Sequence, residues 1–353
     1  MNDRVILKNL DKTRNYSPVI TLNDDEPVVI FSDLHMGNGS SRDDFLHNSG
    51  LFEYILNNYY LSNQSRLVLN GDVEELYKFR LGSITKKWHN LYSIFHEFSQ
   101  KDRFYKIIGN HDYELQFARR RGINRNLLQG LRLHSSGGEI FIYHGHQTSN
   151  YMDTYNRLSL YLVRYLVHPL RIRNLTFTLN SRKIFRTERL SYEFSARNRI
   201  ISIIGHTHKP LFESFSKRDT LTYNIERLLR KYPKVNKEKK KRKIEKNIRE
   251  FSEELKNLRE KNIINLRDEV YHDGLLVPSL FNTGAAIGKR GLTGIEIAGG
   301  KISLVYWFDR HRSERYINYK GIDTYQLPGT DYFKAILKSE NLDYIFARIN
   351  LMA

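Results

Sequence analysis

VVIFSDLH, at residues 28 to 35, is the first of five stretches in which a run of β-favouring residues ends in side chains that bind metals. Each run stops in a glycine or polar turn. Because strands that stop in this way deliver their side chains to one rim, we expect the five turns to form one site. The other four stretches are RLVLNGD (66–72), FYKIIGNHD (104–112), EIFIYHGH (139–146) and IISIIGHTH (200–208).

The five turns contribute carboxylates, one asparagine amide and several imidazoles. This mixture of oxygen and nitrogen suits Mn, Fe, Zn or Co better than an all-oxygen Ca or Mg cage. The chain has no cysteine that could compete as a ligand. The candidates are Asp33, His35, Asp72, Asn110, His111, His144, His206 and His208.

Spacing within the turns suggests how two ions are held. Asp33 and His35 alternate along a segment that reads as extended, so we expect both to face one side and chelate one ion. The same reasoning applies to His206 and His208. Asp72, in the tight GD turn, is the expected bridge, because one carboxylate can join two cations about 3.5 to 4 Å apart.

The surrounding glycines support a joint reading of these motifs. If each histidine is considered alone, the simpler interpretation is a hydrogen-bonded polar residue at the end of a strand. However, Gly71, Gly109, Gly145 and Gly205 adjoin the candidates, where backbone must approach closely or adopt a positive φ. Two ions in such a site clamp phosphate oxygens and lower the pKa of a bridging water toward about 7. The pattern therefore predicts hydrolysis of a phosphoester or pyrophosphate.

The composition is that of a folded enzyme. With 353 residues, a mass of 41.9 kDa and 40% hydrophobic residues, the chain can bury a large core. The absence of cysteine excludes disulfides. Neither an apolar leader nor a run of 18 apolar residues is found, so we expect a soluble, cytoplasmic protein, with peripheral contact to the inner membrane face as an option.

The positive charge is concentrated in two segments. The net charge of +18 suggests an anionic partner. Residues 150–200 carry ten Lys or Arg against three acids, and residues 217–269 carry eighteen against ten. These two segments hold 15 of the 18 excess charges, so the strand-rich remainder is nearly balanced.

Alternating β and α patterns predict an α/β layer fold. Apolar residues at helical spacing predict helices at 51–61 and 87–98, packed on a sheet, and an amphipathic helix at 151–172. This last helix either packs on the main domain or forms a basic, apolar lid beside the metal rim. We expect an N-terminal extension (1–26), a core (27–215) that includes a helical lid (150–199), a charged helical insertion (217–269), the continued core (270–310) and a C-terminal tail (311–353).

The charged stretch at 225–268 predicts a long helix or a helical hairpin. Ile244, Ile248, Phe251, Leu255 and Leu258 recur at helical spacing. Such runs are usually solvated helices without a specific partner. Pairing with another chain and nucleic-acid binding are the two sharper alternatives.

The motif set SDLHMG, NGD, GNHD, YHGH and GHTH resembles the calcineurin-like metallophosphoesterase superfamily over residues 27–308. The resemblance implies a four-layer sandwich, in which helices flank two mixed β-sheets, with helical insertions. It implies two divalent ions, foremost Mn with Fe or Zn as alternatives. It assigns Asp33, His35, Asp72 and His208 to one ion, and Asp72, Asn110, His144 and His206 to the other.

The resemblance also suggests roles for neighbouring residues. His111 would lie beside the scissile group, where it donates a proton or stabilises the leaving oxygen, and Glu75 would orient it. Asp112 is expected to complete its turn, and Asn282 to Gly284 to shape the rim. His146 is expected either to support the ligands or to face substrate.

Within the superfamily, the chain is most similar to bacterial enzymes related to UDP-2,3-diacylglucosamine diphosphatase, on the basis of SDLHMG, a His-Gly pair before a helical insertion, and GHTHKP. Those relatives carry Arg at the position of His111 and Asp at that of His146, so the substrate is expected to differ. The first hypothesis is a metal-dependent phosphohydrolase of a phosphorylated small molecule or lipid, such as a nucleotide-linked or lipid-linked diphosphate. The alternative is a nuclease or nucleic-acid-directed phosphodiesterase that uses the basic insertion, and an anionic membrane surface is a further expected partner.

Overall fold

The computed structural model describes residues 3–23, 25–117, 127–148, 181–213, 238–264, 277–317 and 321–353, together with residues 221, 225, 228, 229, 231–235 and 319. The chain divides into two compact units. Unit 1 comprises Met1–Phe212 and Ser279–Leu351, and unit 2 comprises Glu213–Pro278. Each unit is considered separately below.

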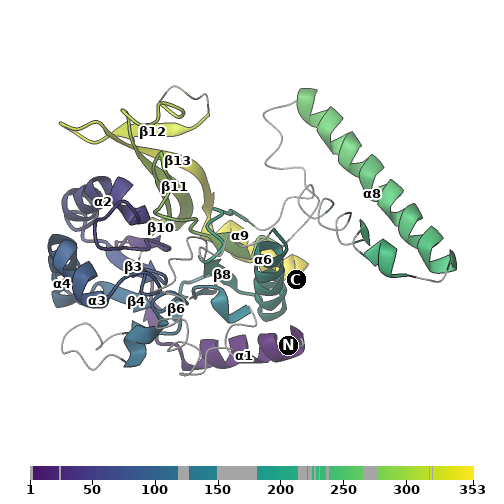
Figure 1. Cartoon of the computed structure of the whole chain (residues 1–353), viewed down its shortest axis with the longest axis horizontal. Helices are drawn as coiled ribbons and strands as arrows, with labels where there is room; N and C mark the ends of the chain where they lie inside the picture. The colour runs from purple at the N-terminus through teal and green to yellow at the C-terminus, as the bar shows by residue number, and fades with distance from the viewer. Residues whose placement is uncertain are drawn as a thin grey trace. The chain divides into compact units, whose positions relative to one another are not determined.

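Two mixed β-sheets form the centre of unit 1 (Figure 1). One sheet has the order β12-β13-β11-β10-β2-β3-β4-β5, and the other has the order β1-β6-β7-β8-β9. Each contains both parallel and antiparallel pairs. The predicted α/β class with two mixed sheets is therefore confirmed. The strands are β1 (Val19–Thr21), β2 (Val28–Phe31), β3 (Arg66–Asn70), β4 (Phe104–Ile107), β5 (Leu127–Leu128), β6 (Leu131–His134), β7 (Glu139–Ile142), β8 (Ile201–Ile204), β9 (Leu280–Asn282), β10 (Leu292–Ala298), β11 (Lys301–Asp309), β12 (Asp323–Gln326) and β13 (Tyr332–Asn341).

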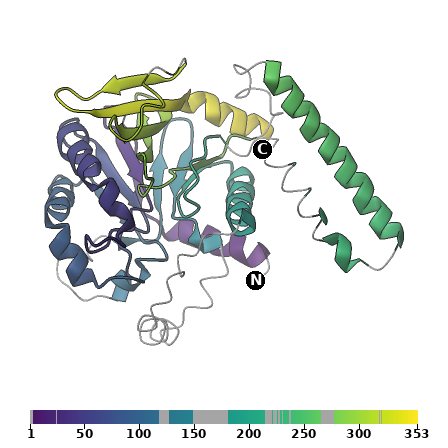
Figure 2. The ribbon, with the colours of Figure 1, turned by 45° about the horizontal axis from the view of Figure 1, so that its top comes forward.

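Helices lie outside both sheets of unit 1 (Figure 2). The early helices α2 (Ser49–Ile55), α3 (Leu81–Lys87) and α4 (His89–Gln100) lie on the side of the eight-stranded sheet, and α6 (Ser181–Asn198) contacts β8 and β9 of the five-stranded sheet. The remaining helical elements are α1 (Asp3–Tyr16), α8 (Glu238–Ile264), α9 (Leu342–Met352), the π-helical turn η2 (Leu56–Tyr60) and the 3-10 turns η1 (Asp44–His47), η3 (Tyr113–Phe117), η4 (His146–Thr148) and η7 (Tyr232–Lys234).

Alternating side chains of the central strands build the main core. Val29 and Phe31 of β2 and Leu67 and Leu69 of β3 are buried in one cluster with residues of the covering helices. The intervening residues are also buried, as expected for parallel strands covered on both faces. This packing confirms the helices predicted at 51–61 and 87–98, although the first ends in the π-helical turn η2. Their partners in the cluster include Phe52, Ile55, Phe95, Phe98 and Trp307.

Both chain termini belong to unit 1. The expected extension 1–26 forms α1 and the edge strand β1, which pairs with β6. Arg14 of α1 forms an ion pair of 2.5 Å with Glu139 of β7, and Asp3 pairs with Arg186 and Arg189 of α6. The tail, for which the sequence suggested no elements, supplies β12, β13 and α9.

The predicted lid lies largely outside the described residues. The amphipathic helix predicted at 151–172 falls wholly outside them. Of the wider segment 150–199, residues Ser181–Asn198 form α6 in the helical layer of unit 1. None of the described helices is long and apolar enough to cross a bilayer.

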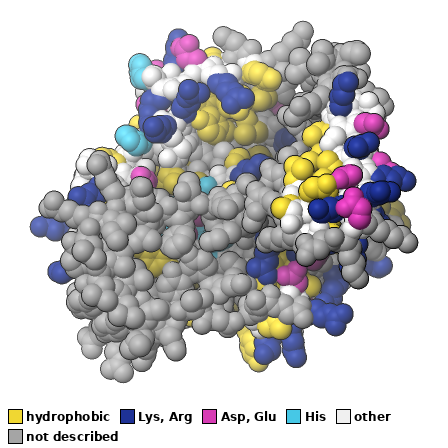
Figure 3. All heavy atoms as spheres, turned by 45° about the vertical axis from the view of Figure 1, so that its right-hand side comes forward, with side chains coloured by type: hydrophobic (Ala, Val, Ile, Leu, Met, Phe, Trp, Pro, Cys, Tyr) yellow, Lys and Arg dark blue, Asp and Glu magenta, His cyan; other side chains and the backbone are white. Residues whose placement is uncertain are grey.

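Unit 2 contains α8, which is 27 residues long and confirms the long helix predicted within 225–268. Before it lie residues 221, 225, 228, 229 and 231, which are helical, and the turn η7. Lys and Arg side chains are spread over the visible described surface of the molecule, as the net charge leads one to expect (Figure 3).

Candidate metal centre

The predicted motifs all follow strands, and these strands come from both sheets. The turns after β2, β3 and β4 belong to the eight-stranded sheet, and those after β7 and β8 belong to the five-stranded sheet. Their side chains meet in three groups whose ligand atoms lie within 4.8 Å of one another. The groups are Asp33, His35 and His208; Asp72, His144 and His206; and His35, Glu75 and His111.

The first group lies at the end of β2. The Asp33 Oδ1 atom is 3.1 Å from His208 Nε2 and 3.8 Å from His35 Nε2. The two imidazole Nε2 atoms are themselves 3.1 Å apart. One carboxylate oxygen and two ring nitrogens therefore converge on one point.

The second group is fully buried. His144 Nε2 is 3.1 Å from Asp72 Oδ2, and its other ring nitrogen, Nδ1, lies 2.7 Å from the Asn70 carbonyl oxygen. A carbonyl oxygen can only accept, so the Nδ1–H group donates to it, and Nε2 is the ring nitrogen that can bind a metal. His206 completes the group.

Asp72 lies between the two groups. Its Oδ2 atom, 3.1 Å from His144 Nε2, is also 3.9 Å from His35 Nε2, which belongs to the first group. Asp33 Oδ1 is likewise 3.9 Å from His144 Nε2. The groups are thus adjacent, and each of the two carboxylates lies 3.9 Å from a histidine of the other group.

The backbone at these residues differs from the predicted extended segments. Asp33, His35, Asp72, His206 and His208 all have a positive φ, between 47° and 65°. Asp33 and His35 still share one group, but His206 and His208 are divided between the two. The period-two argument was therefore wrong for the GHTH turn, because the chain there is left-handed and not a strand.

The glycine prediction is confirmed. A Cβ atom on Gly109 would lie 2.1 Å from Asp72 Oδ1, and one on Gly71 would lie 2.4 Å from His144 Nδ1. A Cβ on Gly205 would lie 2.7 Å from Asp33 Oδ2. Gly71 and Gly145 have φ values of +81° and +110°. Only glycine permits the backbone to lie this close to the clustered side chains.

Glu75 links the first group to His111. Its two oxygens lie 3.1 Å from His35 Nδ1 and 2.9 Å from His111 Nδ1, so one carboxylate orients both rings. The His111 backbone N–H donates to Asp72 Oδ1 at 2.8 Å. The side chain of His111 is 12% exposed and that of His208 is 37% exposed, whereas His144 is fully buried. Solvent therefore reaches the site from the side of His111 and His208.

The other predicted residues lie around the clusters. Asp112 accepts hydrogen bonds from the backbone N–H groups of Gly109 and Val73, at 2.6 and 2.8 Å, and completes its turn as expected. Asn282 donates to the Gly205 carbonyl and to Thr207, so it braces the GHTH turn. The buried His146 ring lies 5.5 Å from that of His144, between centroids.

Nearby charges and burial both shift the pKa values of the clustered aspartate and histidine side chains. Burial alone would raise the pKa of Asp33, but the His208 and His144 imidazoles outweigh it and hold that pKa below its usual value. Burial disfavours charge on His144, yet the Asp72 and Asp33 carboxylates raise its pKa to about 9. Burial, with the nearby His144, lowers the pKa of His206 to about 3.

Several buried atoms of the site lack hydrogen-bond partners among the described residues. They are Asp33 Oδ1, Asn110 Oδ1, His144 Nε2 and His206 Nε2. Burying a polar atom without a hydrogen-bond partner costs folding free energy. Each of these four atoms carries a lone pair that a metal ion could accept. The Asn110 amide oxygen, in the turn after β4, is thus one of these unpartnered buried atoms. The residues fit divalent ions of the N/O-preferring class.

The sequence missed residues that support the ligands. The Ser32 hydroxyl donates to Asp33 Oδ2, and it also lies 2.6 Å from the Thr283 hydroxyl. Thr207 donates to the buried Glu188 of α6 at 3.0 Å. Ser32 adjoins a motif and could have been suspected, but Glu188 is distant in sequence and carries no local signal.

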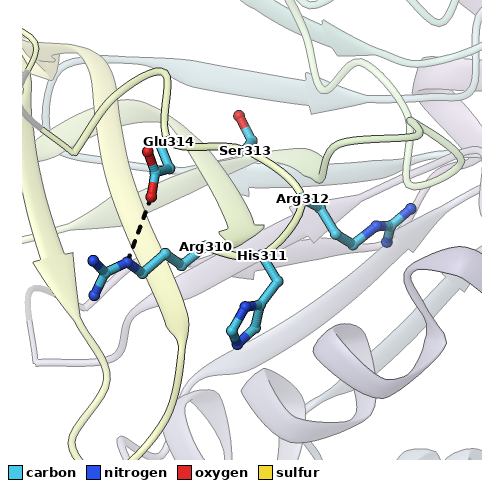
Figure 4. Close-up of a pocket in the computed structure, with 5 residues that line it drawn as sticks. All are labelled: Arg310, His311, Arg312, Ser313 and Glu314. Carbon is cyan, nitrogen blue, oxygen red and sulfur yellow. Dashed lines mark ion pairs between the residues drawn. The ribbon is translucent and has the colours of Figure 1, made fainter.

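A separate, open pocket of about 420 Å³ lies after β11 and contains none of the clustered residues (Figure 4). Arg310 pairs with Glu314 at 3.7 Å, and His311 pairs with Asp331 at 3.0 Å. Arg312 donates to Asn48 Oδ1 at 3.1 Å and to backbone carbonyls. These cations are held by the protein itself, so the pocket is not a competing candidate site.

Comparison with known families agrees with the geometry. A family model described as calcineurin-like phosphoesterase matches residues 26–235, which include all five motifs. A comparison with curated proteins gives no match.

Proposed function

The chain belongs to the calcineurin-like phosphoesterase family of metal-dependent hydrolases, and we propose that it cleaves a phosphoester or pyrophosphate bond at a centre of two divalent ions. Manganese is the proposed metal, with iron or zinc as alternatives, because the donors combine carboxylate oxygen with imidazole nitrogen. Members of the family typically bind two divalent metals.

The observation that carries the proposal is the position of Asp72 between two groups of donors. Its Oδ2 atom is 3.1 Å from His144 and 3.9 Å from His35. In this proposal Asp33, His35, Asp72 and His208 hold one ion, and Asp72, Asn110, His144 and His206 hold the other. When bound, the ions supply positive charge against the phosphate oxygens and acidify a water molecule.

The remaining chemistry falls to residues at the open side of the site. Glu75 fixes the His111 ring through Nδ1, so the opposite ring nitrogen, Nε2, is the atom available to a substrate. A proton on that nitrogen can pass to the leaving oxygen as the bond to phosphorus breaks. Asp33 and Asp72 are buried, and one oxygen of each already accepts hydrogen bonds from a hydroxyl or a backbone N–H group, so we assign neither of them the proton transfer.

The proposed substrate is a phosphorylated small molecule or lipid, such as a nucleotide-linked or lipid-linked diphosphate. Support comes from the resemblance of SDLHMG and GHTHKP to enzymes of that type. His111, in place of the arginine of those relatives, supports a substrate that differs from theirs.

Turnover of bis-p-nitrophenyl phosphate with added Mn²⁺ tests the reaction. We expect hydrolysis by the wild type, and a loss of at least about 1,000-fold in kcat for Asp72→Ala, because both metal positions lose a donor. Asp25→Ala, at an exposed acid outside the site, is the matched control and should keep full activity. Wild-type protein that remains inactive with Mn²⁺, Fe²⁺ and Zn²⁺, or Asp72→Ala with full activity, would count against the proposal.

A nucleic-acid-directed phosphodiesterase is the second candidate. It is favoured by exposed Lys and Arg in the first half of α8, including Lys240, Arg242, Lys243, Lys246 and Arg249. Binding through such residues should weaken linearly with the logarithm of salt concentration. Binding of DNA or RNA that shows no salt dependence, or that survives deletion of residues 225–268, rules this candidate out. Flotation with anionic vesicles distinguishes it from docking to a membrane surface.

A further inference from the structure

The GHTH turn after β8 supplies one donor to each of the two groups of the metal centre. His206 belongs to the buried group that contains Asp72, and His208 belongs to the group that contains Asp33. Both histidines are left-handed, with φ values of 65° and 57°. Thr207 is the only residue between them. The way in which Thr207 is held therefore decides how the two imidazoles lie relative to each other.

The buried Thr207 side chain belongs to a directed chain of hydrogen bonds. The Asn282 amide oxygen accepts from the Gly284 N–H group at 2.9 Å, which identifies the other end of the amide as its NH2 group. That NH2 group donates to the Thr207 hydroxyl oxygen at 2.8 Å. The single hydroxyl hydrogen is then directed to Glu188 Oε1, at an oxygen–oxygen distance of 3.0 Å. Thr207 is thus fixed from two sides.

Glu188 lies on α6, which packs on β8 and β9 (Figure 1). The residue is only 2% exposed, and burying a carboxyl group costs folding free energy unless its oxygens have hydrogen-bond partners. Leu190 and Phe194 supply a buried apolar face to the same helix, and Asp3 pairs with two of its arginines. These contacts account for the docking of α6, so the carboxyl group of Glu188 calls for a separate explanation.

We propose that Glu188 is a positioning residue for the metal centre, which acts through Thr207 to hold His206 and His208 in their separate groups. The role rests on the two-ion centre proposed above. Glu188 itself contacts neither an ion nor a substrate in this role. Its loss should therefore act first on the affinity for metal. Loss of a residue that orients metal ligands typically weakens binding about 10- to 100-fold.

Calorimetric titration of the full-length protein with Mn²⁺ alone is the first measurement, and the wild type should bind two ions. Glu188→Met removes the acceptor at similar side-chain volume, and Thr207→Val removes the donor. Each should weaken Mn²⁺ binding at least about tenfold. Glu188→Gln keeps an oxygen that accepts from Thr207, so it should restore most of the affinity.

Glu193→Met is the matched control. It makes the same substitution on the same helix, at a carboxylate that pairs with Arg189 and whose side chain is 41% exposed. Because this carboxylate has no part in the contacts of the GHTH turn given above, the affinity for Mn²⁺ should equal that of the wild type.

A double variant separates positioning from a purely structural role. Each single substitution leaves a buried polar group without its partner, which lowers stability by itself. Glu188→Met combined with Thr207→Val replaces both partners by apolar groups, while Asn282 keeps its hydrogen bond to the Gly205 carbonyl. The metal-free double variant should therefore unfold at a temperature close to that of the wild type. It should still bind Mn²⁺ as weakly as either single variant, since the two residues act as one unit.

Normal Mn²⁺ affinity in the double variant overturns the proposal, as do losses that add in the double variant. An equal loss in Glu188→Gln and Glu188→Met overturns it too, because the acceptor oxygen would then have no effect. A double variant that does not fold assigns the pair to folding and also overturns the role. Wild-type protein that binds fewer than two Mn²⁺ ions is a different result, since it contradicts the two-ion centre itself and is seen before any substitution is made.

Discussion

At the scale of single residues, the candidate centre depends on backbone that is unusual for side-chain-bearing residues. Asp33, His35, Asp72, His206 and His208 are left-handed, which costs on the order of 1 kcal/mol or more for each residue. Bonds between the turns hold this conformation: Asp33 N–H donates to Gly71 O, and His35 N–H donates to Asp72 O. The protein itself therefore arranges the donors, so metal binding requires little further ordering.

The close approach at Gly109 gives the sharpest prediction at this scale. In Gly109→Ala the new methyl group would lie 2.1 Å from Asp72 Oδ1 and 2.3 Å from Asp72 N, so the Asp72 turn must shift. We expect a loss of about 2 to 3 kcal/mol in the free energy of unfolding and a weaker affinity for Mn²⁺. Chemical denaturation and metal titration measure the two effects. Gly50→Ala in α2, whose methyl group meets only Tyr332 at 3.7 Å, should be close to neutral.

Glu75→Gln tests the link between His35 and His111. The two oxygens of Glu75 each contact one ring, whereas glutamine has one neutral oxygen and an NH2 group. One of the two contacts is therefore lost or weakened, and His111 should lose its fixed orientation. We expect kcat to fall about 10- to 100-fold, with a change in the pH dependence of kcat and little change in KM. Steady-state kinetics across pH provides the measurement, with Asp25→Asn, at an exposed acid outside the site, as the control. An unaltered pH profile with unaltered kcat would remove Glu75 from the proposed mechanism.

The identities of the candidate residues could be predicted from the sequence, but their local geometry could not. Asp and His residues that recur in turns directly after apolar strands are rarely explained by anything other than a metal site. Asp72 and His144 could therefore be chosen without coordinates. The sign of φ at His206 could not, because it depends on the backbone of distant turns: His206 N–H donates to Asp33 Oδ2, 173 residues earlier.

At the scale of elements, prediction succeeded where one segment carries its own signal. The strand β2 is a continuous apolar run, β3 and β8 are mostly apolar, and α4 has a clear apolar face. The C-terminal strands β12 and β13 gave no such signal. Lys334 of β13 is buried, and its Nζ atom lies 2.6 Å from Glu296 Oε2. A prediction that buries only apolar side chains would place this lysine at the surface.

The docking of α1 on the five-stranded sheet predicts a dependence of stability on pH. Burial would raise the pKa of Glu139, but hydrogen bonds from Arg14 and Arg132 dominate and lower it to about 2. A lowered pKa in the folded state means that this stabilisation is complete above the unfolded pKa of about 4.3 and is lost as pH falls toward 2.

Glu139→Gln should therefore destabilise the protein by about 1 to 2 kcal/mol at pH 7, and the difference from wild type should shrink steadily below pH 4. Thermal unfolding across pH 3 to 8 measures the difference. Asp25→Asn, which alters an exposed carboxylate, should show no comparable trend. A difference that is constant across this range would mean that Glu139 acts through packing and not through its charge.

At the scale of the whole molecule, the insertion leaves and re-enters unit 1 at neighbouring points. Leu211 and Asn282, both in unit 1, exchange backbone hydrogen bonds of 3.1 and 2.9 Å, so the two ends of the intervening segment lie side by side. All the candidate ligands belong to unit 1. The insertion can therefore be removed from the chain without removing any candidate ligand. Composition alone shows only that residues 217–269 are more charged than their surroundings.

Replacement of residues 214–277 by a short Gly/Ser linker tests this separation. Because Leu211 and Asn282 already lie side by side, a linker of a few residues spans the gap at little cost in loop entropy. We expect unit 1 to fold, bind Mn²⁺ and hydrolyse bis-p-nitrophenyl phosphate with kcat within about threefold of the full chain, since no candidate ligand is removed. The same protein should lose any salt-dependent affinity for anionic partners. Circular dichroism and metal titration establish folding before activity is compared. A folded, metal-binding unit 1 without activity would show that the insertion contributes directly to catalysis, whereas retained activity would assign it to association with other molecules.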